Sequence, residues 1–365
     1  MDDGMILVIG GGVAGLAAAW RCAQAGAAVT VLEADRVGGA ASRVAAGYIE
    51  PGVPETRMGE DAQALIDDEW TSARQWPAFV EELVAETGLD VDFRTDGQLR
   101  IAYAEDVPAA RADHDRRVAA GWQAEWLDAA GVRALEPALS PEIEGGCFLP
   151  RICWVDGRLL CAALAEALRR RGAILREGAR ARGLIVEGGA CRGAVLEDGE
   201  ALRADRVILA GGWARGALQA LPQEVPAAAP VRGVILALGM APEAPLIRRI
   251  VRTPAGPLVP RSDGRLLVGV TRSPGDTRGF ADAGAVAALL ENGFRALPGA
   301  RALPFLEAAW GIRPYLETDA PFAQASAEAA GLIYSLGYGA DGYLRAPLWS
   351  RRAADLALGR NAPSA

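Results

Sequence analysis

Apolar residues near the start of the chain follow first a strand-like and then a helical pattern. Residues 5–9 (MILVI) form a short apolar run that predicts a buried parallel strand. The alanine-rich stretch from Val13 to about Ala25 predicts a helix, which Gly26 ends. A second apolar run at 28–32 predicts another strand, with Glu33 at its end. This order predicts a parallel sheet covered by helices, and therefore an α/β fold.

Three glycines lie between the first strand and its helix, at the spacing G-x-G-x-x-G. Gly10 permits a tight turn, Gly12 lets a pyrophosphate approach the backbone, and Gly15 lets the helix pack closely on the sheet. The N–H groups at the start of that helix favour a phosphate, and the carboxylate of Glu33 can accept hydrogen bonds from a ribose. A glycine triplet alone is weak support, but the complete order of strand, turn, helix, strand and acid predicts a dinucleotide site.

A segment rich in glycine and alanine follows Glu33, where an NAD-binding unit would continue with another strand and helix. One interpretation is an ordinary loop of small residues, and the other is a path along a flat, extended ligand. The segment resembles the amino-acid oxidase family of flavoproteins, particularly the glycine oxidase type associated with thiazole biosynthesis. In that family an acid, an arginine and the pattern G-x-x-S-x-x-A-A-G run beside FAD; here they correspond to Glu33, Arg36 and residues 39–47.

The resemblance continues over nearly the whole chain. Asp156 stands before an amphipathic stretch (LLCAALAEALRRR), as at the V-D-P helix start of the family. Residues 205–213 form an acid-led apolar strand that runs into glycines. Residues 311–314 (GIRP) match G-L-R-P, and residues 337–347 (GYGADGYLRAP) match G-H-x-R-N-G-I-L-L-A-P. The resemblance implies an FAD enzyme, with FAD held non-covalently because no cysteine lies in the C-terminal segment where the related sarcosine oxidases would attach it.

Two sets of site residues follow from the resemblance. The candidate catalytic residues are Arg313, Tyr338 and Asp341. The candidate FAD-binding residues are Gly10, Gly12, Val13, Ala14, Gly15, Glu33, Ala34, Arg36, Ser42, Ala46, Gly47, Gly211, Gly212, Trp213, Arg313, Gly339, Asp341, Gly342, Tyr343 and Leu344. Arg313 is expected to bind the substrate carboxylate through two charge-assisted hydrogen bonds, and a structural salt bridge is the alternative. Residues 306–312 predict a strand that Pro314 ends.

Several positions in the presumed pocket depart from the glycine oxidase pattern. Ala340 and Asp341 stand where that pattern has Arg and Asn. Tyr338 replaces a His, and Pro257 replaces a Tyr that faces the substrate. Glycine is therefore less expected as the substrate than a larger amino acid or a secondary amine. Two interpretations of Asp341 stay open: contact with an amine or guanidine of the substrate, or capping of the helix that begins nearby.

The motifs divide the chain into two interleaved units. Residues 1–85, 140–215 and 300–365 are expected to form a discontinuous, Rossmann-like FAD-binding domain of the glutathione-reductase type. Residues 86–139 and 220–299 are expected to form an α+β substrate domain on a mixed or antiparallel sheet. Residues 86–139 are polar and helix-prone, and residues 220–299 contain strand-like runs.

Composition and charge narrow the class of protein. A net charge of −8 over 365 residues argues against binding to nucleic acid or to an anionic membrane. The apolar stretch near the N-terminus is too short and too rich in glycine to span a membrane. One histidine (His114) and five cysteines without a C-x-x-C pair predict no metal site. The odd cysteine count, with no secretion signal visible, favours a cytoplasmic location; oligomeric state cannot be read from these features.

The resemblance also implies the reaction. The C–N bond of an amino acid or related amine would be oxidised to an imine by hydride transfer to flavin N5, which needs no histidine base. A self-contained oxidase that uses oxygen is the first expectation. The second is a dehydrogenase, or a flavin subunit that passes electrons to a quinone or a partner protein. The third is a degenerate flavin-binding protein without catalytic activity.

Overall fold

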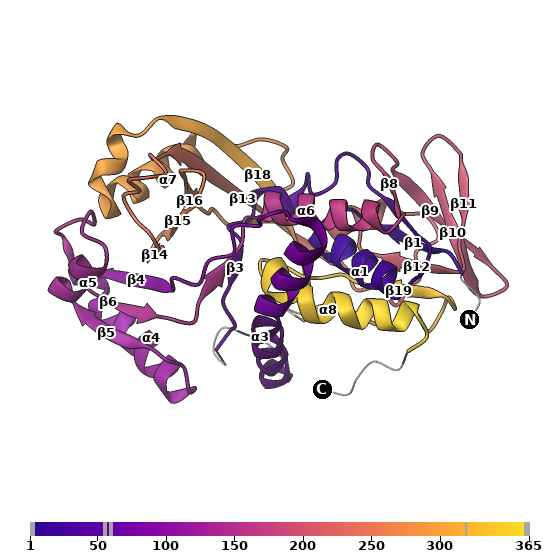
Figure 1. Cartoon of the computed structure of the whole chain (residues 1–365), viewed down its shortest axis with the longest axis horizontal. Coiled ribbons are helices and arrows are strands. Elements are labelled where there is room, and N and C mark those ends of the chain that lie inside the picture. Colours follow the sequence, from indigo (N-terminus) through magenta and orange to yellow (C-terminus); the bar gives the residue numbers. More distant parts are fainter. Residues whose placement is uncertain (1–3, 54–56, 58–60, 318–319, 361–365) are drawn as a thin grey trace.

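Two large sheets, one parallel and one mixed, form the two halves of the molecule (Figure 1). The computed structural model describes residues 4–53, 57, 61–317 and 320–360. The short strands β3 (Tyr48–Ile49) and β7 (Cys153–Trp154) pair with each other where the chain passes between the halves. Among the described helices, none is both long and apolar enough to cross a membrane.

The parallel sheet has five strands in the order β19-β12-β1-β2-β8. In that order the strands span Leu332–Tyr334, Arg206–Leu209, Ile6–Ile9, Val29–Leu32 and Ile174–Arg176. Successive side chains of a strand point to opposite faces, so Ile6 and Val8 pack on one side of the sheet while Leu7 and Ile9 pack on the other. The unbroken apolar runs in the sequence reflect this burial on both faces.

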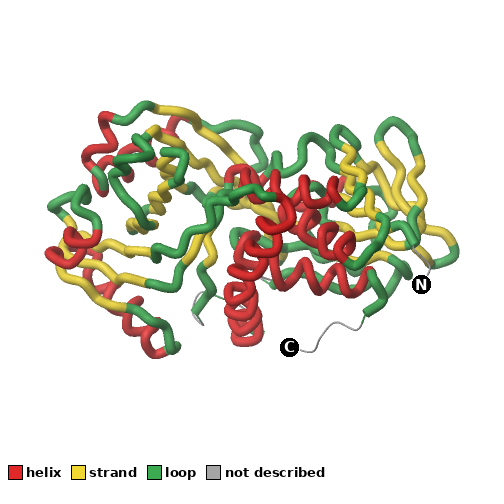
Figure 2. The backbone as a smooth tube through the Cα atoms, viewed as in Figure 1, coloured by secondary structure: helices red, strands yellow, loops and turns green. Residues whose placement is uncertain are grey.

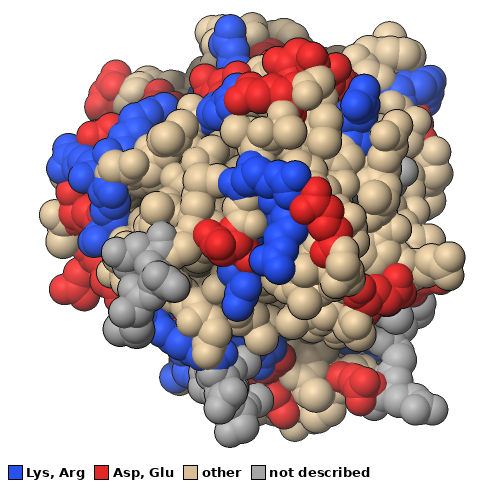
Figure 3. All heavy atoms as spheres, turned by 90° about the vertical axis from the view of Figure 1, so that its right-hand side faces the viewer, with Lys and Arg blue, Asp and Glu red and all other residues tan. Residues whose placement is uncertain are grey.

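Helices cover one face of the parallel sheet, and a small antiparallel sheet covers the other (Figure 2). The helices are α1 (Val13–Gln24), α3 (Ala62–Thr87), α6 (Gly157–Arg170) and α8 (Gly342–Ala357). The small sheet consists of β9 (Ala181–Glu187), β10 (Ala190–Leu196) and β11 (Ala201–Arg203). Gly188 and Gly189, with φ of 55° and 76°, form the turn of the β9–β10 hairpin. Basic and acidic side chains are interspersed over this end of the molecule (Figure 3).

The mixed sheet has nine strands in the order β17-β13-β16-β15-β14-β4-β6-β5, with β18 paired to β13. In that order they span Ser273–Pro274, Ala228–Gly239, Arg265–Gly269, Gly256–Pro260, Ile250–Thr253, Gln98–Tyr103, Ile143–Leu149 and Glu125–Asp128, and β18 spans Phe305–Leu316. Only β14 and β4 pair in parallel among these strands. The helices of this half are α4 (Val107–Ala119), α5 (Ala129–Leu135) and α7 (Ala283–Ala296). Shorter elements are α2 (Ala41–Val44) and the 3-10 turns Ala104–Asp106, Gly212–Ala217 and Pro298–Ala302.

The structure confirms the first strand, helix and second strand, and it alters the picture of the other half. Residues 86–139, expected to be helix-prone, contain β4 and β5 as well as α4 and α5. Strands β6 and β18 lie in segments expected for the FAD-binding domain, yet both pair within the mixed sheet. A strand's own sequence shows that it is buried, but its partner decides which sheet it joins.

Candidate active site

The glycine turn between β1 and α1 has the close contacts that its spacing predicts. Gly10 has a φ of 113°, and a Cβ atom there would lie 2.3 Å from the carbonyl oxygen of Ala210. A Cβ atom at Gly15 would lie 1.9 Å from the carbonyl oxygen of Gly10, so any side chain would push α1 off the sheet. Gly12, immediately before α1, has no side chain to cap the helix N-terminus, so an anionic group can approach the backbone there.

Two side chains hold this turn from neighbouring segments. The carboxylate of Glu33, just beyond β2, accepts hydrogen bonds from the N–H of Gly11 over 2.8 Å and from that of Asp35 over 2.9 Å. The hydroxyl of Ser42 in α2 accepts from the N–H of Val13 over 3.0 Å. The predicted turn, acid and serine are therefore in contact. A glycine turn at a helix N-terminus, with a carboxylate at the end of the second strand, fits the pyrophosphate and ribose of FAD.

The remaining predicted FAD contacts of this half lie in three loops: Ala34 and Arg36 after β2, Ala46 and Gly47 after α2, and Gly211, Gly212 and Trp213 after β12. The carbonyl of Ala46 accepts a hydrogen bond from Arg261 over 2.8 Å. Gly47 has a φ of 77°, and a Cβ atom there would lie 2.0 Å from a backbone oxygen. Arg36 is exposed, and Trp213 is 38% exposed, so both side chains are available to a ligand.

Arg313 lies in β18, and the prediction that Pro314 ends this strand is wrong. The strand continues to Leu316, and Pro314 lies opposite Pro230 of β13. The carbonyl of Pro314 accepts from the N–H of Gly339 over 3.3 Å, on the side away from β13. The N and O atoms of one strand residue point to the same edge, so this proline removes no hydrogen bond from the β13–β18 ladder.

The guanidinium of Arg313 lies over β13 and forms no ion pair with a carboxylate of the described residues. It donates to the carbonyl oxygens of Arg232 over 3.4 Å and Thr271 over 3.2 Å. A Cβ atom at Gly233 would lie 2.5 Å from its Nη2, so the glycine makes room for it. Burial lowers the pKa of Arg313. The alternative of a structural salt bridge is therefore absent from the described part of the chain, and the site suits an anionic ligand.

The loop before α8 connects Arg313 with the glycine turn. A Cβ atom at Gly339 would lie 3.0 Å from the ring of Tyr315, two residues beyond Arg313. A Cβ atom at Gly342 would lie 3.9 Å from Cγ1 of Val13, the first residue of α1. The predicted substrate anchor and the predicted phosphate turn therefore meet one loop at the junction of the two halves.

Asp341 precedes α8, but its carboxylate does not cap the helix. It pairs instead with Arg57 over 3.0 Å and with Arg345 over 3.8 Å. Both arginines also pair with Glu69 over 2.9 Å, and the side chains of Glu69 and Arg345 are fully buried. Of the two interpretations of Asp341, helix capping is wrong, and contact with the substrate stays a prediction. Sequence reasoning missed this network because 276 residues separate Glu69 from Arg345.

Tyr338, in the loop before α8, and Tyr343, in the first turn of α8, are both buried. Tyr338 is 4% exposed, its hydroxyl lies 2.9 Å from that of Ser335, and burial raises its pKa. Tyr343 donates a hydrogen bond to the carbonyl of Ser42. A Cβ atom at Gly157 would lie 2.0 Å from the Tyr343 hydroxyl, which explains why residue 157 departs from the proline of the resembling pattern. The hydroxyl of Tyr338 is therefore not exposed, as the predicted catalytic role would require.

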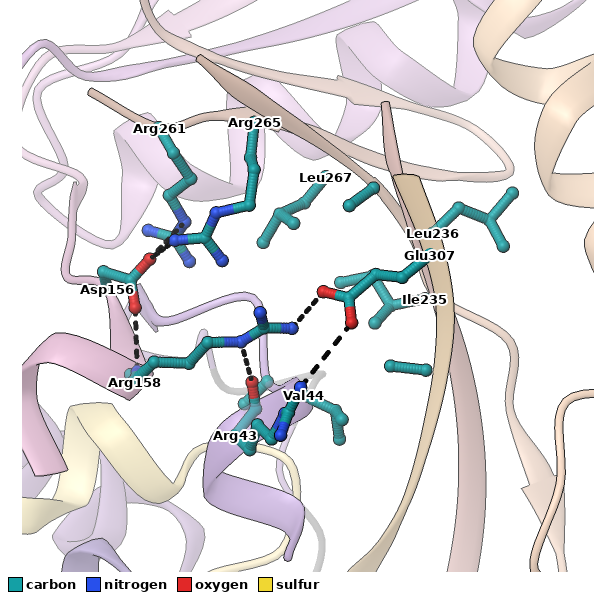
Figure 4. Close-up of a pocket in the computed structure, with 14 residues that line it drawn as sticks. Arg43, Val44, Asp156, Arg158, Ile235, Leu236, Arg261, Arg265, Leu267 and Glu307 are labelled. Atoms are coloured by element: carbon teal, nitrogen blue, oxygen red, sulfur yellow. Dashed lines mark hydrogen bonds and ion pairs between the residues drawn. The ribbon is translucent and has the colours of Figure 1, made fainter. Parts of the chain in front are cut away.

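A small pocket beside α6 is lined by charged side chains from both halves of the molecule (Figure 4). Arg158 pairs with Glu307 of β18, and Arg43 lies 3.7 Å from the same carboxylate. Asp156 caps α6 by accepting from the N–H of Arg158 over 2.8 Å, and it pairs with Arg265 over 2.6 Å. These contacts tie α2 and α6 to the mixed sheet. They therefore link the two halves of the molecule at the junction.

The family model described as DAO, FAD-dependent oxidoreductase, matches residues 5–356. The chain belongs to this family. The match includes the glycine turn, β18 and the loop before α8, which are the segments that meet at the junction.

Similar proteins include a bifunctional protein and two oxidases of known structure. The bifunctional protein ThiO/ThiG of Synechocystis sp. is 30% identical over 359 residues, covering 97% of this chain but 51% of that protein, so this chain spans about half of its length. The structure of glycine oxidase from Geobacillus kaustophilus is 26% identical with a TM-score of 0.89, covering 99% of this chain and 96% of that one. The structure of iminodiacetate oxidase from Chelativorans sp. is 25% identical with a TM-score of 0.86, covering 99% and 97%.

These likenesses confirm the expected fold, the non-covalent FAD cofactor and the class of reaction. The protein is an FAD-dependent oxidoreductase. The roles of individual site residues rest on the geometry described above.

Proposed function

We propose that the protein is an oxidase of an amino acid whose carboxylate binds Arg313, with oxygen as the electron acceptor. The guanidinium of Arg313 carries this proposal, because it is half-buried at the junction and contacts backbone carbonyl oxygens rather than an acid in the described residues. A carboxylate that reaches two of its nitrogen atoms would compensate the charge that burial leaves unpaired.

The chain's part in the reaction is to hold the substrate in one orientation. FAD, when bound, supplies the acceptor for the hydride that leaves the substrate. Arg313 fixes the carboxylate, and so limits the directions in which the neighbouring C–H bond can point. The substrate loses a hydride from carbon and a proton from its neutral amine, and water converts the resulting imine to an oxo acid and ammonia. His114 lies in α4 and pairs with Asp115 over 2.8 Å, and the proposed reaction assigns it no role.

The surroundings of Arg313 support a substrate larger than glycine. Ala340 is exposed and carries no charge, so the loop before α8 offers no second arginine beyond Arg313 at that position. Pro257 is buried in β15 and has no hydroxyl to offer. We therefore propose an amino acid with a side chain, or one with a substituent on its nitrogen.

The test is a kinetic comparison of wild-type holoenzyme with Arg313→Met over a panel of amino acids and N-methyl amino acids. Loss of a charge-assisted hydrogen bond, about 2–3 kcal/mol, should lower kcat/KM by about 30- to 150-fold. Arg301→Met is the control, because it makes the same replacement at an exposed arginine that stacks on Phe294 of α7. The proposal fails when Arg313→Met keeps the kcat/KM of an oxidised amino acid within twofold of wild type.

Two further parts of the proposal concern the electron acceptor and the location. The acceptor is tested by admitting air to the reduced enzyme: rapid return of the oxidised flavin spectrum, with peroxide, supports oxygen, and slow return supports a different acceptor. We also propose a cytoplasmic location. All five cysteines are free thiols, which supports a reducing compartment.

A further inference from the structure

An arginine that sequence reasoning did not single out lies beside Arg313. Arg272 follows β16 and precedes β17, and β17 pairs with β13 at Val231, the residue opposite Arg313. The guanidinium of Arg272 is exposed, donates to the hydroxyl of Tyr315 over 2.8 Å, and lies 4.9 Å from the centre of that ring. Arg313 and Tyr315 are two residues apart on one strand, so their side chains share a face of the sheet.

The two guanidinium groups are close enough to repel each other. The carbonyl that accepts from Arg313 belongs to Thr271, the residue immediately before Arg272. Burial lowers the pKa of Arg313, and the positive charge of Arg272 lowers it further. Asp341 opposes this effect, but its carboxylate pairs with Arg57 and Arg345.

Neither Arg272 nor Arg313 forms an ion pair with a carboxylate elsewhere in the described residues. A single substrate carboxylate, bound by Arg313 in the bidentate geometry that a guanidinium favours, leaves the exposed Arg272 without a counter-charge. A second carboxylate on the substrate would supply it. The hydrogen bond and ring contact to Tyr315 already orient Arg272, so less conformational freedom is lost when it binds an anion.

We propose that Arg272, oriented by Tyr315, is a second anion anchor, and that the substrate is an amine bearing two carboxylates: an acidic amino acid, or an amino acid with a carboxyalkyl group on its nitrogen. This proposal rests on the proposed function, because it assigns the inner carboxylate to Arg313. The resembling pattern places a second arginine at residue 340, and here Arg272 supplies it from the segment between β16 and β17.

The proposal is tested with pairs of compounds that differ in one charge: aspartate and asparagine, glutamate and glutamine, each as both enantiomers, and iminodiacetate and sarcosine. Wild-type holoenzyme should prefer the acidic member of at least one pair by tenfold or more in kcat/KM. Arg272→Met should lower that preference to about one through KM, with kcat little changed, and Tyr315→Phe should lower it by a smaller factor. Arg301→Met should preserve it.

A binding measurement separates the anchor from catalysis. Succinate carries two carboxylates and no amine, and butyrate is its counterpart with one. Isothermal titration of oxidised holoenzyme should show tighter binding of succinate than of butyrate, and Arg272→Met should remove the difference.

The possible results distinguish this proposal from the proposed function. When the acidic and neutral compounds of each pair are oxidised equally and Arg272→Met changes the kcat/KM of neither, the proposal of a second anchor is wrong. The proposal of an amino acid oxidase then stands. When Arg272→Met weakens both members equally, the two arginines share one carboxylate and the dicarboxylate is wrong. When no amine reduces the flavin, the proposed function fails, and equal binding of succinate and butyrate would then refute the anchor as well.

Discussion

Replacing Glu69 by Gln tests whether the buried charge network beside the candidate site holds α3 and α8 together. The side chains of Glu69 and Arg345 are fully buried and 2.9 Å apart, and the carboxylate also accepts from the N–H of Gly52 over 2.9 Å. Glutamine keeps the shape but removes the charge, which leaves Arg345 with only the longer ion pair to Asp341, over 3.8 Å, among the described carboxylates. Breaking a buried ion pair on one side costs about 3–5 kcal/mol.

The assay is thermal unfolding of holoenzyme with excess FAD. At about 2.1 cal/mol/K per residue, a chain of this length has an unfolding entropy of about 0.8 kcal/mol/K, so Glu69→Gln should lower Tm by about 4–6 °C if unfolding is two-state. Asp68→Asn is the matched control, because Asp68 joins the same two helices through Arg352 over 2.6 Å but the pair is partly exposed. It should cost less than about 1 kcal/mol. Equal losses in the two variants would refute the reasoning, as would a failure of Glu69→Leu with Arg345→Met to recover stability relative to Glu69→Gln.

Three further predictions follow from the same structure. Gly15→Ala places a methyl group 1.9 Å from the carbonyl oxygen of Gly10, so the purified protein should release FAD or unfold at lower urea concentration, and normal flavin content and stability would count against the close packing. Asp156 is buried, which raises its pKa, but Arg261 and Arg265 outweigh this and lower it below its ordinary value. Ionised Asp156 therefore contributes its full stabilisation at pH values above the ordinary pKa of an aspartate. This stabilisation is lost as the pH falls through the lowered pKa of Asp156. Urea unfolding should show Asp156→Asn less stable than wild type at pH 7 by about 2–4 kcal/mol, with a smaller gap in acid; a gap that grows in acid would contradict this. Burial raises the pKa of every thiol, to about 11 or about 12 in four of the five, so a thiol reagent at pH 8 should react slowly with native enzyme and fully in urea; rapid reaction of a native thiol would contradict this burial.

The parts of the fold that the sequence predicts well are those whose physical causes are local. Gly15 is required by a contact within one strand–turn–helix unit, the carbonyl oxygen of Gly10, so the glycine spacing alone indicates the unit. Pro314 shows the limit of a local rule. A proline ends a strand only when its nitrogen faces the ladder, and the partner strand decides which way it faces.

The site is predicted less completely because its chemistry comes from distant segments. Arg313 is found through the pattern around it, but Arg272 is a lone arginine with no motif, and only strand pairing places it nearby. The role of Asp341 likewise depends on Arg57 and Arg345, and through them on Glu69. No periodicity in a single segment reports such contacts.

The measurement that tests the central claim most directly is the absorption spectrum of purified holoenzyme, recorded without oxygen during titration with amino acids and N-substituted amino acids. The account predicts an oxidised flavin spectrum that bleaches with one class of amino acid in wild type, and with much higher concentrations of that compound in Arg313→Met. A flavin that no amino acid bleaches, or that bleaches equally well in both proteins, would contradict it.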